Sequence, residues 1–260
     1  MRSMSPPKAV AVVGFKGAGK TRVVEALVRE LSRRGYRVGT LKHASGEHPL
    51  DTPGKDTYRH MEAGSYSTAI LTSKGSAVYL NHPVDLREII PLLGPVDFII
   101  LEGFKSLDMV ARIIVPKAPG DIEPLSNGLE IAVVPPSGVE APLYEKDIPV
   151  FPISGIGELV DLILGKAFPI LPGLDCGSCG YEGCKALAKA ILAGKATAER
   201  CTALFGGGVR LKVDGKTIPL NPFVRSFMGN VVLGMVRTLK GVERPKGIEI
   251  SVDVGELEDG

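Results

Sequence analysis

The sequence has little that would suit it to binding nucleic acids or crossing membranes. Tryptophan is absent and aromatic residues make up 5% of the 260 residues, so platforms for stacking single-stranded bases are not expected. The formal net charge is only +2, and basic residues are interleaved with acidic ones, which excludes an obvious polybasic face. The longest apolar stretch, Phe223 to Met235, is broken by Arg225, Asn230 and Gly234, so no segment is expected to span a bilayer.

The N-terminal residues are not expected to form a secretory leader. Residues 1–7 reach the first apolar run too soon to form a signal peptide, which predicts a cytoplasmic protein. With 44% hydrophobic and 23% charged residues, the composition is ordinary for a soluble globular protein. The length suffices for one large domain, or for a medium domain and a small one.

A glycine-rich loop near the N-terminus matches Gly-x-x-x-x-Gly-Lys-Ser/Thr at every fixed position. The loop reads Gly14-Phe15-Lys16-Gly17-Ala18-Gly19-Lys20-Thr21. An apolar run, 10–13, precedes it. A segment that places Val24, Leu27, Val28 and Leu31 on one helical face follows it. A plain glycine turn between strand and helix is the alternative, but the full strand–loop–helix context favours a nucleoside-triphosphate site.

Each residue type in this loop has a chemical use. Glycines let the backbone N–H groups turn inward, and the following helix N-terminus adds positive potential where phosphates bind. Lys20 is expected to reach the β- and γ-phosphates, and Thr21 to bind Mg²⁺. The residues expected to surround the phosphates are Gly14, Lys16, Gly17, Ala18 and Gly19.

Strands and helices alternate through residues 1–168, which predicts an α/β domain with a mostly parallel sheet. Expected strands cover 10–13, 36–42, 67–71, 77–80, 96–101, 113–115, 131–134 and the region of 150–151. Expected helices cover 55–63, 86–93 and 158–164, besides the one that follows the loop. Residues 169–173 are expected to be a linker, with a separate small module over 169–207.

The C-terminal residues 208–260 predict a small α+β unit. Alternating apolar residues on both sides of Asp214-Gly215 indicate a hairpin with a two-residue turn. Asn221 is expected to cap a helix that opens at Pro222, with the apolar face Val224, Met228, Val231, Val232 and Met235. A last alternating strand is expected over 248–254.

The four cysteines lie together, with the spacing Cys176-x2-Cys179-x4-Cys184-x16-Cys201. In a cytosolic chain this clustering indicates metal binding rather than disulfides. Zinc sites made of four thiolates usually have two Cys-x2-Cys pairs, and only one is present here. A distant fourth thiolate after uneven loops favours an iron–sulfur cluster, with zinc and free structural thiols as the alternatives.

The run 174–184, together with Ala188, Ala190, Gly194, Ala196 and Cys201, resembles a small [4Fe–4S] module. That module occurs in corrinoid iron–sulfur proteins and in membrane electron-transport subunits. The resemblance covers about thirty residues. It implies a [4Fe–4S] cluster held by Cys176, Cys179, Cys184 and Cys201.

Several polar residues follow expected strands, where ligands collect in an α/β sheet. Glu102 is placed to hold Mg²⁺ or to orient a water, with a helix-capping or surface carboxylate as the alternative. Asp51 is a candidate metal or water ligand in a loop that no apolar strand precedes. Lys42, Arg59 and Lys105 could neutralise phosphates or simply be solvated. His43 and His48 could ligate zinc, but histidines so placed more often form hydrogen bonds.

Four of these stretches appear in order and resemble the molybdopterin-guanine dinucleotide biosynthesis protein B (MobB-like) family. They are 14–21, Leu41-Lys42-His43, 51–59 with Ala63-Gly64, and 101–105, so the resemblance covers roughly residues 8–165. It implies a GTP-binding P-loop protein, usually dimeric, that assists the attachment of GMP to molybdopterin. The expected partners are therefore nucleotide, molybdopterin and a cofactor nucleotidyltransferase.

Two features depart from the minimal family pattern. No Asn-Lys-x-Asp motif for reading guanine is present, so a preference for GTP rests on the resemblance, as does slow GTP hydrolysis. The cysteine module is an addition to the minimal family member. It opens a second hypothesis, in which a nucleotide-gated iron–sulfur protein transfers electrons to, or activates, a metalloenzyme.

Overall fold

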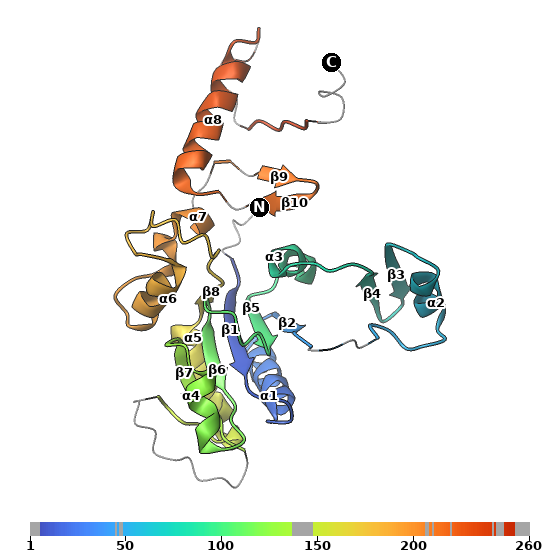
Figure 1. The fold of residues 1–260 in the computed structure, drawn as a ribbon, viewed down its shortest axis with the longest axis vertical. Helices are drawn as coiled ribbons and strands as arrows, with labels where there is room; N and C mark the ends of the chain where they lie inside the picture. Colours follow the sequence, from blue (N-terminus) through green and yellow to red (C-terminus); the bar gives the residue numbers. More distant parts are fainter. Residues whose placement is uncertain are drawn as a thin grey trace.

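The centre of the fold is a parallel sheet in the order β2–β5–β1–β6–β7 (Figure 1). The protein is described by a computed structural model over residues 6–44, 46, 49–136, 148–205, 208–209, 211–218, 220–240, 242 and 247–252. The strands are β1 (Lys8–Val13), β2 (Val38–Lys42), β5 (Phe98–Glu102), β6 (Ala111–Ile114) and β7 (Glu130–Val133). The predicted α/β class with a mostly parallel sheet is confirmed.

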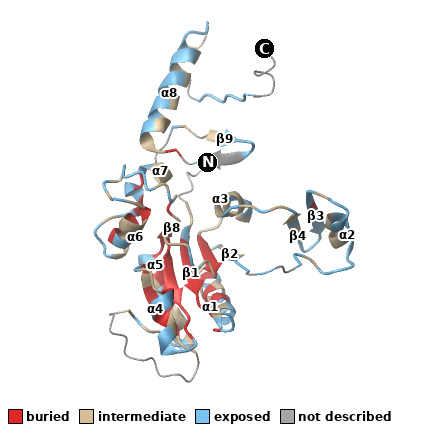
Figure 2. Cartoon of the chain, in the orientation of Figure 1, coloured by how far each residue is buried: buried red, intermediate tan, exposed pale blue. Residues whose placement is uncertain are grey.

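Helices cover both faces of this sheet, which is why its strands are almost continuously apolar. On one face, α1 (Lys20–Arg33) and α5 (Ile156–Lys166) pack over Val10, Val12 and Ile100. On the other, α3 (Leu86–Ile89), a 3-10 helix over Ile90–Leu93 and α4 (Ile122–Leu125) pack over the alternate side chains of the same strands. Figure 2 shows this buried centre in red.

Two of the expected strands do not join the central sheet. β3 (Ser67–Thr72) and β4 (Gly75–Leu80) pair antiparallel with each other, and α2 (Asp56–Glu62) packs beside them. Together they form a lobe that stands apart from the sheet (Figure 1). Leu71 is 84% exposed and Val78 is 62% exposed, so the lobe has apolar side chains without enough of a core to bury them.

The segment expected to be a linker is instead part of the core. β8 (Phe168–Pro169) pairs antiparallel with the first residues of β1. Leu171 is 1% exposed, and its N–H donates to the carbonyl oxygen of Met109 at 3.1 Å. Large apolar side chains at Phe168 and Leu171 explain this, because burying them stabilises the fold by about 1.5–3 kcal/mol each.

The cysteine module shares the core of the first domain. It contains α6 (Cys184–Leu192), a 3-10 helix over Ala198–Arg200 and α7 (Thr202–Phe205). Leu187 and Ala188 of α6 belong to the same buried cluster as Leu159 and Ile163 of α5. The Lys166 ammonium also donates to the carbonyl oxygen of Leu192 at 2.8 Å. The module is therefore docked onto the sheet layers rather than tethered to them.

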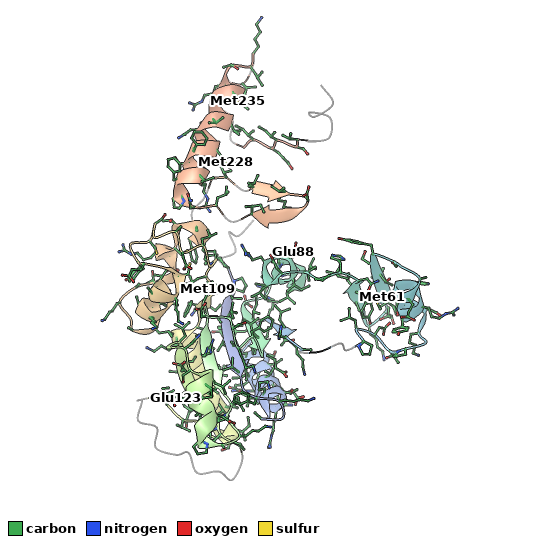
Figure 3. The ribbon with its side chains drawn as sticks, viewed as in Figure 1. Met61, Glu88, Met109, Glu123, Met228 and Met235 are labelled. Atoms are coloured by element: carbon green, nitrogen blue, oxygen red, sulfur yellow. The ribbon has the colours of Figure 1, made fainter. Side chains whose placement is uncertain are left out.

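The C-terminal residues form separate elements with little burial. The predicted hairpin is present as β9 (Leu211–Val213) and β10 (Lys216–Ile218). The helix α8 (Pro222–Arg237) begins as predicted, with the Asn221 side chain accepting from the N–H of Val224 at 2.9 Å. None of the α8 residues is buried, and the helix, with Met228 and Met235 along it, projects from the molecule (Figure 3).

The last expected strand is wrong for the residues that the structure describes there. Residues 247–252 form neither a helix nor a strand, because alternating apolar residues specify a face and not the edge that would pair with it. Within the described residues, none of the helices combines the length and apolarity needed to cross a bilayer.

Candidate functional site

The glycine-rich loop begins where β1 ends, and its geometry depends on the absence of side chains. A Cβ atom added to Gly14 would lie 2.3 Å from the carbonyl oxygen of Val115, the residue that follows the neighbouring strand β6. Gly17 and Gly19 have φ angles of 77° and 88°, a left-handed conformation that favours glycine. The loop thus approaches backbone closely and turns sharply before α1 starts at Lys20.

Replacing Gly14 with alanine is expected to destabilise the protein by about 1–3 kcal/mol, the usual cost of overpacking. The added methyl would meet a backbone oxygen at the end of β6, which cannot rotate away. Gly120→Ala is the matched control, since nothing lies within 4 Å of a Cβ added there. Urea unfolding of both variants measures the difference. Equal midpoints for Gly14→Ala and wild type would contradict the close approach.

The functional side chains at the loop converge on Glu102, at the carboxyl end of β5. The Thr21 hydroxyl donates to Glu102 Oε1 at 2.9 Å, and Lys42 Nζ lies 3.2 Å from the same oxygen. Lys20 Nζ donates to the carbonyl oxygen of Phe15 at 2.9 Å. Glu102 is 8% exposed, so a carboxylate far from Thr21 in the sequence is held against the loop by partners on two other elements.

Positive charge gathers around Lys20 at the P-loop. Burial lowers the pKa of Lys20; Glu102 opposes the shift, and Lys105, Lys42 and Lys117 add to it. Lys105 Nζ lies 5.1 Å from the centre of the Phe15 ring. Four ammonium groups and one carboxylate leave the P-loop with a net positive charge, and such a site attracts a polyanion such as a triphosphate.

Lys117 is a site residue that the sequence analysis missed. It follows β6, and its Nζ lies 3.5 Å from where a Cβ on Gly17 would be. The rule that singled out Glu102, a polar residue just after an apolar strand, applies equally to Lys117 and could have found it.

The structure does not bring every predicted residue to the loop. The Asp51 carboxylate accepts from the backbone N–H of Thr52 at 2.7 Å and also from the Thr57 hydroxyl, and these hydrogen bonds lower its pKa. Asp51 and Arg59 both belong to the lobe around α2, away from the sheet (Figure 1). Asp51 and Arg59 therefore lie in the lobe, and neither has a described contact with the P-loop.

Of the two histidines, His43 lies beside Glu102 and Phe104. The His43 N–H donates to the carbonyl oxygen of Glu102 at 2.9 Å, and its ring lies 5.5 Å from the ring of Phe104. His43 is thereby tied to the nucleotide edge through its backbone and its ring. His48 lies outside the described residues.

The four cysteines line a single cavity beside α6. Its walls also include Leu174, Gly177, Gly183 and Leu187. Cys184 and Cys201 are 7% and 5% exposed, whereas Cys176 lies on the surface. The Asp175 carboxylate accepts from the backbone N–H of Cys184 at 2.6 Å and fixes the loop at the start of the helix.

The chemistry of these thiols, rather than the space between them, is what suits a metal centre. Burial raises the pKa of the Cys201 thiol, and the nearby Cys184 and Cys179 raise it further, so a cationic centre would relieve the mutual repulsion of the thiolates. Within the described residues, no three His, Cys, Asp or Glu side chains are grouped closely enough to hold a single ion. The cavity that the four thiols line has a volume of about 10 Å³, roughly the space of one water molecule, so a cluster would need the cysteine loop to open.

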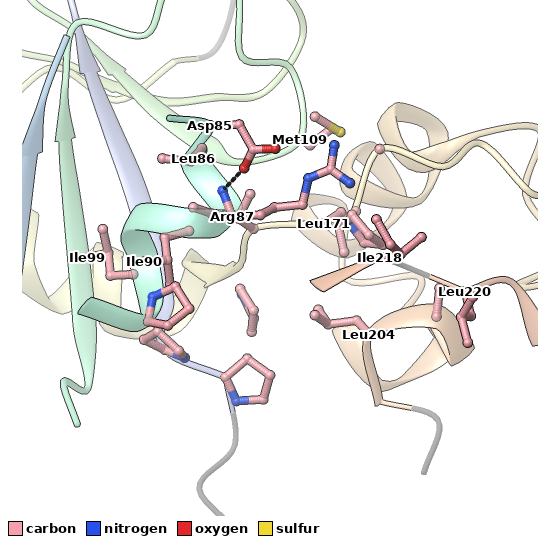
Figure 4. A pocket seen from close by; sticks show the side chains of 18 of the residues that line it. Asp85, Leu86, Arg87, Ile90, Ile99, Met109, Leu171, Leu204, Ile218 and Leu220 are labelled. Carbon is pink, nitrogen blue, oxygen red and sulfur yellow. Dashed lines mark hydrogen bonds between the residues drawn. The ribbon is translucent and has the colours of Figure 1, made fainter. Parts of the chain in front are cut away.

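A second cavity of about 740 Å³ adjoins the cysteine cavity, and Pro172 and Ala203 line both. It lies between the segment after β8, α3 and the C-terminal hairpin, with Arg87, Met109 and Leu220 in its wall (Figure 4). Both cavities are thus at the edge where β1 begins, opposite the edge where the P-loop lies.

Two family models match the chain. "Molybdopterin guanine dinucleotide synthesis protein B" (MobB) matches residues 9–134, and "Putative Fe-S cluster" matches residues 171–203. The first match contains the P-loop, Lys42 and Glu102, and the second contains all four cysteines. The sequence resemblances to a MobB-like domain and to an iron–sulfur module are confirmed.

Comparisons with individual proteins also match the P-loop domain and the cysteine region. The chain is 30% identical to the "Putative molybdopterin-guanine dinucleotide biosynthesis adapter protein" of Methanocaldococcus jannaschii, over 96% of this chain and 99% of the relative. The crystal structure of Bacillus subtilis MobB matches with a TM-score of 0.52 and 28% identity, over 62% of this chain and 98% of that one. A shorter match, 43% identical over 54 residues, is to a protein of the ion-translocating oxidoreductase complex of an Azoarcus species, covering 21% of this chain and 30% of that protein.

The relative that spans nearly the whole chain includes the counterpart of the cysteine module as well as that of the P-loop domain. The match with that relative therefore covers both parts of this chain. The chain belongs to the molybdopterin-guanine dinucleotide biosynthesis adapter protein family.

Proposed function

We propose that this protein binds GTP with Mg²⁺ at the P-loop, hydrolyses it slowly, and acts in the cytoplasm in the maturation of molybdenum or tungsten cofactor. The observation that carries the proposal is the convergence of Lys20, Thr21 and Lys42 on the buried carboxylate of Glu102. Its proposed partners are molybdopterin and a cofactor nucleotidyltransferase, with the chain acting as a homodimer. Guanine as the base is supported by membership of the family and not by a base-reading motif.

In this proposal each residue at the P-loop exchanges one partner for another when nucleotide binds. Lys20 leaves the Phe15 carbonyl oxygen for the phosphates, while backbone N–H groups of residues 14–19 cradle them. Thr21 and Glu102 would hold Mg²⁺. Lys42, Lys105 and Lys117 offset the phosphate charge. Asp51 and Arg59 would join only if the lobe around α2 closed over the nucleotide, so their proposed roles need a second conformation.

Replacing Glu102 with glutamine is expected to preserve nucleotide binding and to slow hydrolysis by about 10²–10³-fold, as for the loss of one electrostatic transition-state contact. The amide keeps the size of the side chain and can still accept from Thr21, but it removes the negative charge beside Mg²⁺. Single-turnover hydrolysis measures the effect. Glu130→Gln, outside the P-loop, serves as the control. A rate equal to wild type would make Glu102 a structural residue.

For the cysteine cavity we propose a [4Fe–4S] cluster held by Cys176, Cys179, Cys184 and Cys201. The single cavity that all four thiols line supports this, together with the family match over 171–203. Such a centre supplies one-electron chemistry. The chain supplies four thiolates, the Asp175 carboxylate that orients the first turn of α6, and apolar walls that limit solvent.

A second candidate function is a nucleotide-gated electron carrier or redox activator of a metalloenzyme. The match of the cysteine region to a protein of an oxidoreductase complex favours it. Anaerobic purification followed by identification of bound nucleotide, metal and pterin separates the two. Bound pterin supports the cofactor role. A redox-active cluster without pterin, reduced by a low-potential donor, supports the carrier.

A further inference from the structure

The connection from β5 to β6 links the nucleotide edge of the sheet to the cysteine module. Both strands run parallel to β1, so residues 103–110, here called the crossover segment, must return from one edge of the sheet to the other. The segment contains no helix or strand. It is also shorter than the dozen or more residues that such connections usually take, so few alternative backbone paths can connect its ends.

At its first end, the crossover segment is part of the nucleotide site. Glu102, the residue before it, accepts from Thr21 and pairs with Lys42. The Gly103 N–H donates to the carbonyl oxygen of Val12 at 2.9 Å, next to the P-loop. Lys105 extends over the Phe15 ring. Any change in the partners of Glu102 therefore acts directly on the segment.

At its other end, the segment contacts the cysteine module. The Asp108 carboxylate lies 3.5 Å from Lys185 Nζ, on the residue that follows Cys184. The Met109 carbonyl oxygen accepts from the N–H of Leu171, and its sulfur lies 2.5 Å from where a Cβ on Gly173 would be. Met109 lies where α6 meets the sheet (Figure 3).

Arg112 of β6 holds the middle of the segment in place. It is 2% exposed, and its guanidinium donates to the carbonyl oxygens of Leu107 at 2.6 Å, Leu125 at 2.8 Å and Lys105 at 3.3 Å. Within the described residues Arg112 has no carboxylate within 4.0 Å. Burial lowers the pKa of the Arg112 guanidinium, and the negative charges of Glu130 and Asp108 only partly offset this effect. Burying a cation without a close ion pair is costly, and here the three carbonyl oxygens supply its hydrogen bonds.

We propose that the crossover segment, clamped by Arg112, couples nucleotide occupancy at Lys20 and Thr21 to the packing of the cysteine module around Cys184 and Cys201. The inference rests on the proposed nucleotide binding. A short segment clamped at its centre cannot absorb a shift at Glu102 locally, so the shift reaches Asp108 and Met109. Coupling between two sites is reciprocal, so the state of the cysteine site changes the affinity for nucleotide by the same factor.

The test uses the full-length, cluster-free protein and the alkylation rates of Cys184 and Cys201 by iodoacetamide, followed by mass spectrometry. Both thiols are buried, so the rates report local opening. GTP with Mg²⁺ is expected to slow alkylation at least about fivefold in wild type, the lower end of common coupling factors. The protection ratio is the alkylation rate without GTP divided by the rate with GTP and Mg²⁺. Asp108→Asn and Arg112→Met are expected to bring this protection ratio close to one. The affinity of Asp108→Asn for GTP should equal that of wild type.

Lys166→Met is the matched control, because it removes a contact with α6 that does not involve the crossover segment. In this variant GTP is expected to slow alkylation as much as it does in wild type. Calorimetry on the same samples separates the possible failures. Absence of GTP binding overturns the proposed function and the coupling together. If wild-type protein binds GTP but GTP does not change its alkylation rates, the coupling alone is overturned. If GTP slows alkylation of Asp108→Asn as much as that of wild type, the route through the crossover segment is overturned.

Discussion

Replacing Lys20 with alanine is expected to weaken GTP binding by at least tenfold, and the largest losses would put it beyond detection by calorimetry. A charge-assisted hydrogen bond contributes about 1.5–3 kcal/mol, and each 1.4 kcal/mol corresponds to about tenfold in affinity. The Lys20 ammonium donates to the carbonyl oxygen of Phe15 within the P-loop at 2.9 Å, and Glu102 attracts its charge. Nothing in the core depends on that contact, so the fold should be kept.

Lys74→Ala is a suitable control for this experiment. Lys74 lies in the turn between β3 and β4, in the lobe away from the P-loop (Figure 1), so its charge is lost without a phosphate contact. Equal affinity of Lys20→Ala and wild type for both GTP and ATP would contradict a nucleotide site at this loop. Equal unfolding midpoints in urea would show that the loss of binding is not a loss of fold.

Replacing Cys184 with serine is expected to be the most damaging single change at the cysteine cavity. Anaerobically prepared wild-type protein should be brown, bleach in oxygen and contain iron and sulfide in a ratio of about one. Cys184 lies in the first turn of α6 and is buried, so its loss removes a ligand and leaves a hydroxyl in an apolar wall. The variant should be colourless or nearly so, as measured by absorbance and by iron analysis.

Nucleotide binding reports whether the Cys184→Ser protein is still folded. The cysteine module shares its core with α5, so some loss of stability is expected, on the order of 1–3 kcal/mol for a buried unsatisfied polar group. The P-loop lies at the opposite edge of the sheet and should still bind GTP. Ser178→Ala, in the same loop, should keep its colour. A colourless, zinc-loaded wild-type protein after anaerobic, iron-replete expression would overturn the cluster.

The sequence was sufficient to predict structure wherever a few adjacent residues define it. The P-loop could be predicted because Gly14 to Thr21 are contiguous and their backbone geometry depends on glycine. The central strands could be predicted because helices on both faces require continuous apolar runs. The Asn221 cap of α8 could be predicted because a cap involves only the next three residues. The family resemblance followed from such local motifs taken in order.

The tertiary structure decided everything that depends on residues far apart in the chain. Thr21 and Glu102 meet only because β5 lies beside β1. The segment around Leu171 has the composition of a linker, but it is buried because the sheet offers an apolar surface beside β1. Residues 248–252 have the alternation of a strand and no partner. Local patterns specify which faces are apolar, whereas contacts between distant segments decide which of those faces are covered.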